Sequence, residues 1–195
     1  MRRLILQHGP CTLIPDGRRS PFESLVRAVA HQQLHGAAAE KILGRFQAVF
    51  GPRRFPSARR LATVSDETLR GCGFSGAKTA ALRDIAEKTI SGVVPSARAI
   101  GKMGDEEIIE RLTAVRGVGR WTAEMLLISM LGRPDVLPAD DFGVRNGFRI
   151  AFGLSELPRP KELIAYGERW RPHGTTAAWY LWRAADSTKK PTSTA

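Results

Sequence analysis

The sequence predicts an all-α protein, and three observations support this prediction. Apolar residues recur every three or four positions along most of the chain, as they do on the buried face of a helix. No segment alternates apolar and polar residues convincingly, so neither strands nor hairpins are expected. Gly, Pro and Asp residues fall where the periodic segments begin and end. We therefore expect roughly eight to ten short helices joined by short turns.

In the N-terminal half, most predicted helices combine an apolar stripe with a residue that can end the helix. Gly51-Pro52 ends the second helix, Gly71 the third and Gly92 the fourth. The supporting residues, in chain order, are Phe22, Leu25, Val26, Val29 and Ala30; Ile42, Leu43, Phe46, Val49 and Phe50; Asp66, Glu67 and Leu69; and the segment 77–90.

In the C-terminal half, Asp105 is expected to cap a helix and Pro160 to open one that runs to Trp170. The segment 121–130 is apolar on most sides, so we expect it to be buried. The tail 186–195 is polar and is expected to fray. The other supporting residues are Ile108, Ile109 and Leu112; Val144, Phe148 and Ile150; and the segment 175–185, in which Trp179 and Trp182 are expected to be core residues.

The length of 195 residues suits one large domain or two small lobes. No linker or repeat separates such lobes, so any division must come from helix packing. A hydrophobic content of 43% and a charged content of 25% exclude disordered and collagen-like classes. No apolar run reaches the roughly 18 residues of a membrane span. The apolar stretch near the N-terminus is too short for a signal peptide. We therefore expect a cytoplasmic protein.

Charge gives the first indication of function. Thirty Lys and Arg against nineteen Asp and Glu make a net charge of +11, which attracts polyanions such as nucleic acid. A solubility bias or an arginine-rich genome would explain the same excess. Cys11 and Cys72 are too few for a four-cysteine iron–sulfur cluster or an all-cysteine zinc site. A single disulfide stays open, although a reducing compartment is the simpler interpretation.

The most informative segment is 112–123, LTAVRGVGRWTA. It predicts a helix that runs into Arg116, a turn over Gly117-Val118-Gly119, and a second helix from Arg120. The two glycines permit positive φ and close approach of another molecule. Amide groups at the start of the second helix favour an anion such as a DNA phosphate. The alternative is an ordinary turn between helices with glycine at the cap.

The extended string around this turn resembles the helix-hairpin-helix DNA glycosylase superfamily, with the hairpin at about 112–127. The string Pro138-Ala139-Asp140-Asp141 narrows the resemblance to the DNA-3-methyladenine glycosylase II, or alkylation-repair, branch. The resemblance covers roughly residues 10–183 and is to the compact form without an N-terminal β lobe. It implies a single domain, residues 1–195, of two helical lobes with a DNA cleft between them.

The resemblance implies that Asp141 is the catalytic residue and that Asp140 is a cap. A carboxylate can stabilise the positive charge that develops on deoxyribose and can orient the attacking water. Capping of an apolar helix alone would also explain the two aspartates. Some superfamily members use a lysine nucleophile in the hairpin, and Trp121 occupies that position here. The chain therefore resembles the monofunctional branch, which stops at an abasic site.

The remaining site residues also follow from the resemblance. Trp121 is expected to stack on the flipped base, with a core role as its alternative. Lys78 and Ser75 are expected at backbone phosphate, unless Lys78 is an ordinary solvated charge. The segment 31–36 is expected to reach the minor groove, unless it is only a polar junction between helices. The substrate-binding set is Trp121, Gln32, Met125 and His173; the DNA-binding set is Gly117, Val118, Gly119, Arg120, Thr122, Gln33, Leu34, Ser75 and Lys78, with Gln33 or Leu34 as the wedge; and the main-chain carbonyls of Thr113, Val115 and Val118 are the ligands of a monovalent cation, Na⁺ or K⁺.

Together these features lead to the hypothesis of a monofunctional DNA glycosylase in base excision repair, acting on 3-methyladenine and related bases in double-stranded DNA. We expect a monomer with no redox cofactor, no catalytic metal and no membrane partner. One alternative is a non-catalytic helix-hairpin-helix DNA-binding protein. Others are a glycosylase–lyase, or a glycosylase for another lesion such as hypoxanthine or etheno-adenine.

Overall fold

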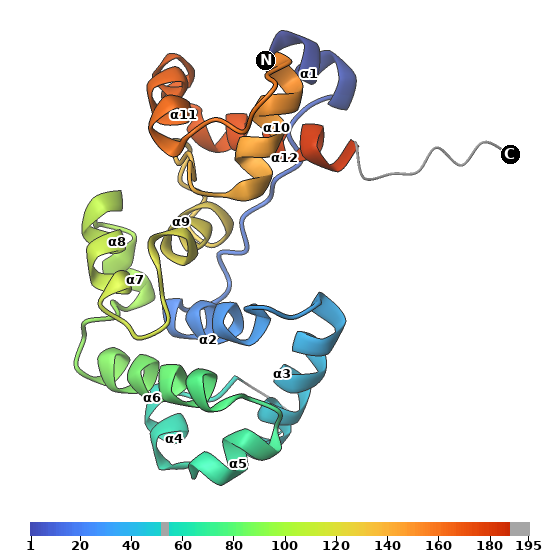
Figure 1. Cartoon of the computed structure of the whole chain (residues 1–195). Coiled ribbons are helices and arrows are strands. Elements are labelled where there is room, and N and C mark those ends of the chain that lie inside the picture. The colour runs from blue at the N-terminus through green and yellow to red at the C-terminus, as the bar shows by residue number, and fades with distance from the viewer. Residues whose placement is uncertain (52–54, 188–195) are drawn as a thin grey trace, which may run out of the picture. The chain divides into compact units, whose positions relative to one another are not determined.

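The computed structural model describes residues 1–51 and 55–187 (Figure 1). Every regular element in this part of the chain is helical, which confirms the all-α prediction. There are more helices than the eight to ten expected. They are α1 (Arg2–His8), α2 (Pro21–His31), α3 (Gly36–Phe50), α4 (Ala58–Thr63), α5 (Asp66–Gly71), α6 (Gly76–Ile90), α7 (Ala97–Ile100), α8 (Asp105–Thr113), α9 (Arg120–Ser129), α10 (Phe142–Phe152), α11 (Pro160–Gly167), the 3₁₀-helix η1 (Glu168–Trp170) and α12 (Gly174–Ser187).

The chain divides into two compact units, which are described separately. The central unit is Gly17–Leu126 and contains α2 to α8 with most of α9. The terminal unit joins Met1–Asp16 to the chain from Leu127 onward and contains α1, α10, α11, η1 and α12. No change in composition marks this division, so it arises from which helices pack together.

Serine caps define most helix starts in the central unit. Five serines accept a hydrogen bond from the amide three residues later, at 3.1–3.4 Å, and so satisfy an amide that the first turn leaves without a partner. Asp105 is not a cap, contrary to expectation. Gly104 has the extended backbone of the N-cap residue, and Asp105 is the first helical residue. The capping serines are Ser20, Ser57, Ser65, Ser75 and Ser96.

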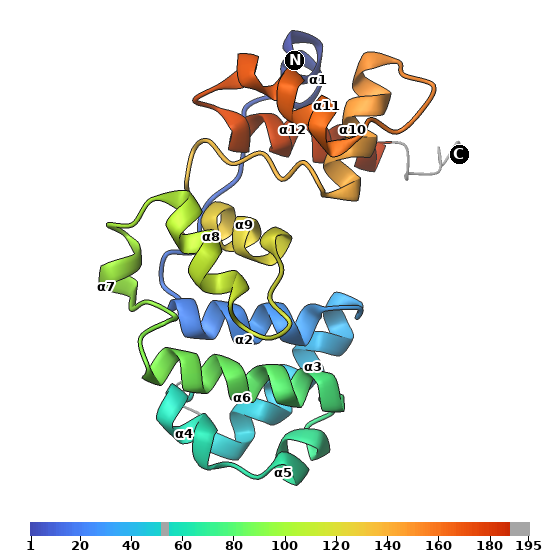
Figure 2. The same ribbon diagram turned by 60° about the vertical axis from the view of Figure 1, so that its left-hand side comes forward.

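The core of the central unit forms where α2 packs against α3 and α6 (Figure 2). All five residues of the predicted α2 stripe are buried. On α3 the ring of Phe46 contacts those of Phe50 and Phe74 at centroid distances of 5.1 and 5.7 Å. Val49 is 42% exposed, so its predicted place in the stripe is wrong. The last turn of α3 directs Phe50, not Val49, into the core.

The core of the terminal unit forms between α10 and α12, which pack closely. Gly147 permits this contact, because a Cβ at that position would lie 1.8 Å from the carbonyl oxygen of Leu181. Trp179 is buried in this core, as predicted. The hydroxyl of Tyr180 donates to the carbonyl of Gly9 at 2.8 Å and so attaches the end of α1 to α12.

The C-terminal part of the chain differs from expectation at two places. The helix that Pro160 opens ends at Gly167 and is followed by the separate 3₁₀ turn η1. Asp186 and Ser187 belong to α12 and are not frayed, while the rest of the predicted tail lies outside the described residues.

Two further properties of the described chain bear on the composition argument. Cys11 and Cys72 are both free thiols, so the disulfide that the sequence left open is absent between them. Among the described residues, no helix combines the length and apolar character that crossing a membrane requires.

Candidate functional site

The hairpin lies in the central unit and consists of α8, a turn and the start of α9. Contrary to expectation, α8 does not run into Arg116. It ends at Thr113, and the amide of Val115 already bonds only three residues back, to the carbonyl of Leu112 at 3.1 Å. The second helix begins at Arg120, as predicted. The segment between them, 114–119, is the hairpin turn.

The two glycines of the turn have different roles. Gly117 has a φ of +78°, and a Cβ there would lie 3.3 Å from the Cβ of Ala81 on α6. Gly119 does not have a positive φ, contrary to expectation, since one left-handed residue reverses the chain here. Open space surrounds the position where a Gly119 side chain would lie. The first hydrogen bond of α9 joins the amide of Ala123 to the carbonyl of Gly119 at 3.2 Å, so the preceding amides lie at the positive end of the helix dipole.

The hairpin side chains predicted to bind DNA are engaged within the protein. Val118 and Thr122 are buried. The guanidinium of Arg120 donates to Glu106 at 2.6 and 3.1 Å and to Glu124 at 3.0 Å. The hydrogen bond with Glu106 raises the pKa of Arg120, and the same bond lowers the pKa of Glu106. What these residues offer to an anion is therefore their main chain.

The segment that follows α2 meets the hairpin turn. The side-chain Nε2 of Gln32 donates to the carbonyl of Gly117 at 2.8 Å, which joins two segments that the sequence singled out separately. Gln33 has a φ of +56°, a left-handed conformation that is uncommon for a residue other than glycine. Leu34 follows with 40% of its surface exposed. The segment 32–34 thus leaves an apolar side chain partly exposed, and the role of Gln33 or Leu34 as the wedge stays a prediction.

Ser75 and Lys78 stabilise helix ends within the central unit. Ser75 caps α6. The ammonium of Lys78 donates to the carbonyl of Ala30, in the last turn of α2, at 2.9 Å. Lys78 is partly buried, and this burial lowers the pKa of its ammonium. The alternative that Lys78 is an ordinary solvated charge is therefore wrong, and its contact with phosphate stays a prediction.

Trp121 and Met125 are one turn apart on α9. Trp121 is 46% exposed, so a purely core role for it is wrong. Met125 is half-buried, and the residues around it on α9 are buried: Thr122, Ala123, Glu124, Leu126 and Leu127. The prediction that this helix is buried therefore holds for most of it but not for the end that carries Trp121.

In the terminal unit, Asp141 is the N-cap residue of α10. Its Oδ1 accepts the amide of Val144 at 2.7 Å and the indole N–H of Trp182 at 2.8 Å. Asp141 is partly buried. Asp140 is exposed and is not the cap, which corrects the roles expected of the two aspartates. Trp182 lies at the edge of the core and not within it, and it orients the carboxylate.

The start of α12 holds the other end of the loop that leads to Asp141. The hydroxyl of Thr175 donates to the carbonyl of Arg133 at 2.6 Å and accepts the amide of Val136 at 3.0 Å. Asp135 accepts the amide of Gly174 at 3.0 Å. One helix therefore anchors this loop at its beginning through Thr175 and at its end through Trp182. His173 is exposed immediately before α12.

A family model described as HhH-GPD superfamily base excision DNA repair protein matches residues 26–172. The chain belongs to the HhH-GPD superfamily. The chain is 45% identical over 175 residues to DNA-3-methyladenine glycosylase 1 of Schizosaccharomyces pombe, covering 88% of this chain and 77% of the relative.

Two solved structures that are similar to this chain are also of proteins named as 3-methyladenine DNA glycosylases or glycosidases. One is S. pombe 3-methyladenine DNA glycosylase (Mag1) in complex with abasic DNA, with a TM-score of 0.84, 40% identity, and coverage of 100% of this chain and 93% of that one. The other is a DNA-3-methyladenine glycosidase from Bacillus halodurans, with a TM-score of 0.87, 36% identity, and coverage of 96% and 85%. Each covers nearly all of the present chain.

In each unit, sequence reasoning missed residues that contact the predicted site segments. Trp182 and Thr175 act on the Asp141 loop, and Asp84 and Lys88 of α6 contact the hairpin turn. The sequence gives no local signal for Asp84 and Lys88, since an Asp and a Lys four residues apart are a common surface pair on a helix. A tryptophan near the end of an apolar segment is equally ordinary.

The residues predicted to bind a monovalent cation lie at the end of α8 and in the hairpin turn. The carbonyl of Val115 accepts the amide of Val118 at 3.1 Å. The hydroxyl of Thr113 donates back to Ile109 and Glu110, within α8. Binding of Na⁺ or K⁺ by the carbonyls of Thr113, Val115 and Val118 stays a prediction.

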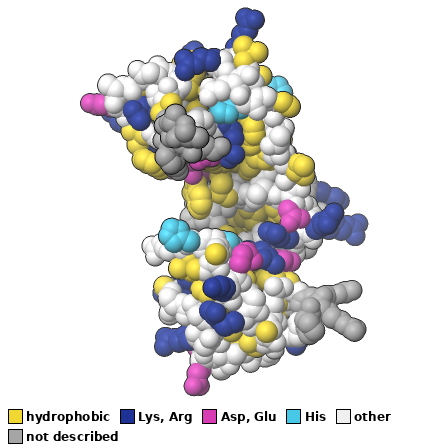
Figure 3. Space-filling model, turned by 90° about the vertical axis from the view of Figure 1, so that its right-hand side faces the viewer, with side chains coloured by type: hydrophobic (Ala, Val, Ile, Leu, Met, Phe, Trp, Pro, Cys, Tyr) yellow, Lys and Arg dark blue, Asp and Glu magenta, His cyan; other side chains and the backbone are white. Residues whose placement is uncertain are grey.

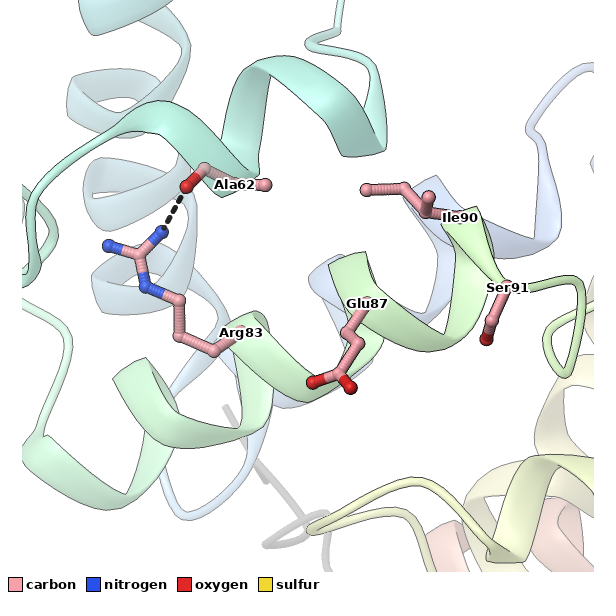
Figure 4. Close-up of a pocket in the computed structure, with 5 residues that line it drawn as sticks. All are labelled: Ala62, Arg83, Glu87, Ile90 and Ser91. Atoms are coloured by element: carbon pink, nitrogen blue, oxygen red, sulfur yellow. Dashed lines mark hydrogen bonds between the residues drawn. The ribbon is translucent and has the colours of Figure 1, made fainter.

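A pocket of about 390 Å³ on the central unit contains none of the predicted site residues. Figure 4 shows that its lining comes from α4, α6 and Ser91, the C-cap residue of α6, with Arg83 directed to the carbonyl of Ala62. On the face that Figure 3 shows, Lys and Arg side chains lie on both units, so the positive charge of the chain is not confined to the hairpin. The pocket is lined by Ala62, Arg83, Glu87, Ile90 and Ser91.

Proposed function

We propose that the chain is a monofunctional DNA glycosylase that hydrolyses the N-glycosidic bond of alkylated bases, such as 3-methyladenine, in double-stranded DNA. The observation that carries the proposal is the fixed carboxylate of Asp141, whose Oδ1 accepts from Val144 at 2.7 Å and from Trp182 at 2.8 Å. The names of the similar proteins support the same reaction. The proposal includes action as a monomer in the cytoplasm, with no redox cofactor and no catalytic metal.

The proposed reaction needs a carboxylate more than it needs a general acid. Alkylation gives the base a positive charge, so the base accepts the electron pair of the breaking C1′–N bond and leaves as a neutral molecule. Positive charge then develops on the deoxyribose, where the carboxylate of Asp141 stabilises it. A water molecule adds its oxygen to C1′ and gives a proton to this carboxylate or to solvent. The products are the free base and an abasic site.

Trp121 has two consequences for this mechanism. An indole cannot form the Schiff base that a lysine nucleophile forms, so no strand cleavage is proposed. Its exposed face also suits a flipped, positively charged base, since such cation–π contacts contribute about 1–2 kcal/mol. A charged lesion is therefore preferred over a neutral one in this proposal.

The proposal is tested by incubating the protein with methylated duplex DNA and identifying any released base by chromatography. We expect 3-methyladenine to be released and the strand to stay intact. Duplexes with hypoxanthine or etheno-adenine test the alternative lesions, and borohydride trapping tests the lyase alternative. Tight DNA binding without release of any base would favour the non-catalytic alternative and overturn the proposal.

Replacing Trp182 with Phe tests the orienting role of the indole. The substitution keeps an aromatic ring at the edge of the core but removes the N–H that donates to Asp141. A hydrogen bond to a charged group contributes about 1.5–3 kcal/mol, so we expect base release to slow by roughly tenfold or more. The rate at saturating DNA should fall while DNA affinity stays unchanged. A variant that releases base at the original rate would show that the indole N–H has no orienting role.

A further inference from the structure

Two side chains of α6 contact the main chain of the hairpin turn. Asp84 and Lys88 are four residues apart and form an ion pair, with the ammonium 3.0 Å from Asp84 Oδ2. The same oxygen accepts the amide of Arg116 at 2.6 Å. The ammonium of Lys88 also donates to the carbonyl of Ala114. One ion pair therefore binds both an amide and a carbonyl of the turn.

These two main-chain groups lie where α8 has ended. A helix leaves its last carbonyls without partners in the helix, and the amides of the following turn need acceptors elsewhere. Here Lys88 supplies the donor for Ala114 and Asp84 supplies the acceptor for Arg116. Gln32 adds a third bond, to Gly117. The conformation of the turn is thus set by side chains that lie outside the hairpin.

The charges of Asp84 and Lys88 offset each other, so the pair acts on the turn through its hydrogen bonds and not by attracting a phosphate. Burial acts to raise the pKa of Asp84, but the hydrogen bonds from the Arg116 amide and the Lys88 ammonium outweigh it and hold the pKa below its usual value. Asp84 is therefore ionised at neutral pH. Its negative charge offsets that of Lys88 at a distance of 3.0 Å, so the pair adds little net attraction for a phosphate.

Main-chain recognition depends on such support. An amide binds a phosphate well only when its direction is fixed in advance, because ordering a loose turn on binding reduces the affinity. The side chains of Val118, Thr122 and Arg120 are already engaged within the protein. The affinity of the turn for DNA then depends on how well its amides are positioned.

We propose that Asp84 and Lys88 are positioning residues that hold the hairpin turn in its DNA-binding conformation. The inference rests on the proposed function only in that DNA is the ligand of the turn. It requires no base release. It predicts that loss of either side chain weakens DNA binding without changing how many phosphates the protein contacts.

The first test measures the dissociation constant for a short duplex containing an abasic-site analogue, over a series of salt concentrations. We expect D84A and K88M each to weaken binding by about tenfold, with the slope of log Kd against log salt unchanged. D84N keeps an acceptor for Arg116 and should lose less. If Lys88 instead contacts a phosphate, the slope for K88M should decrease by about one, and the proposal fails.

Two matched controls remove the same charges elsewhere. E87Q removes a carboxylate from an exposed residue of α6 that lines the pocket of Figure 4, and K161M removes an exposed ammonium from α11. Both should bind DNA with nearly the original affinity. Equal losses in E87Q and D84A, or in K161M and K88M, would mean that general charge, and not the contact with the turn, determines affinity.

The second test needs neither DNA nor activity. The amide proton of Arg116 donates to a carboxylate at 2.6 Å and should resonate far downfield in the NMR spectrum. We expect D84A to move it upfield and E87Q to leave it in place. If D84A does not fold, D84N and K88M carry both tests: the neutral side-chain carbonyl of D84N is a weaker acceptor than a carboxylate, so the Arg116 resonance should still move upfield, by less than in D84A. An unmoved Arg116 resonance in a folded Asp84 variant overturns the proposal, whereas a moved resonance in a protein that releases no base would overturn the proposed function alone.

Discussion

Replacing Asp141 with Asn is expected to slow base release by about 10²–10³-fold and to leave DNA affinity equal or slightly higher. Asparagine is nearly isosteric and is an equally good N-cap, so Val144 and Trp182 keep their acceptor. What is lost is the negative charge that faces the developing positive charge on the sugar. The measurement is single-turnover release of 3-methyladenine, with DNA binding determined on the same preparation.

The adjacent aspartate provides the matched control. Asp140 carries the same charge one residue away, but it is exposed and does not cap α10. Asp140→Asn should therefore release base at nearly the original rate. A similar loss in both variants would indicate a general effect of charge near DNA. A D141N variant that keeps its rate within a few fold would remove Asp141 from the mechanism.

Periodicity and capping residues predicted the longer helices well, because both signals are local. The stripe of α2 is buried throughout, and the predicted start of α9 is correct. The missed helices were α1, α4 and α7, of seven, six and four residues. Such lengths are too short for an apolar period to emerge. Ser57 and Ser96, which cap α4 and α7, were the available signals.

The candidate site was predictable where a motif carries its own chemistry, as at Gly117 and Asp141. The supporting contacts were not, because each joins residues far apart in sequence. Trp182 is 41 residues from Asp141, and Asp84 is 32 residues from Arg116. Periodicity tells which face of a helix is buried, but not which group that face will meet. The engagement of Arg120 by Glu106 was hidden for the same reason.

Replacing Gly147 with Ala is expected to cause the largest loss of stability in the terminal unit. The added Cβ would lie 1.8 Å from the carbonyl oxygen of Leu181 and 2.5 Å from its carbonyl carbon. These are backbone atoms of α12, so no side-chain rotation relieves the clash, and α10 must move away from α12. Overpacking of this kind costs about 3 kcal/mol or more, which corresponds to a decrease of roughly 6–12 °C in melting temperature.

Gly44 provides a control in which the same substitution should have the opposite sign. It lies within α3, and a Cβ there would have no atom within 4 Å. Gly44→Ala should therefore stabilise the protein by about 0.5–1 kcal/mol, since alanine restricts the unfolded chain and favours the helix. Calorimetric unfolding of both variants separates the two effects. If Gly147→Ala raised the melting temperature as Gly44→Ala should, α10 and α12 could not be in backbone contact, and the alignment of Trp182 with Asp141 would need another explanation.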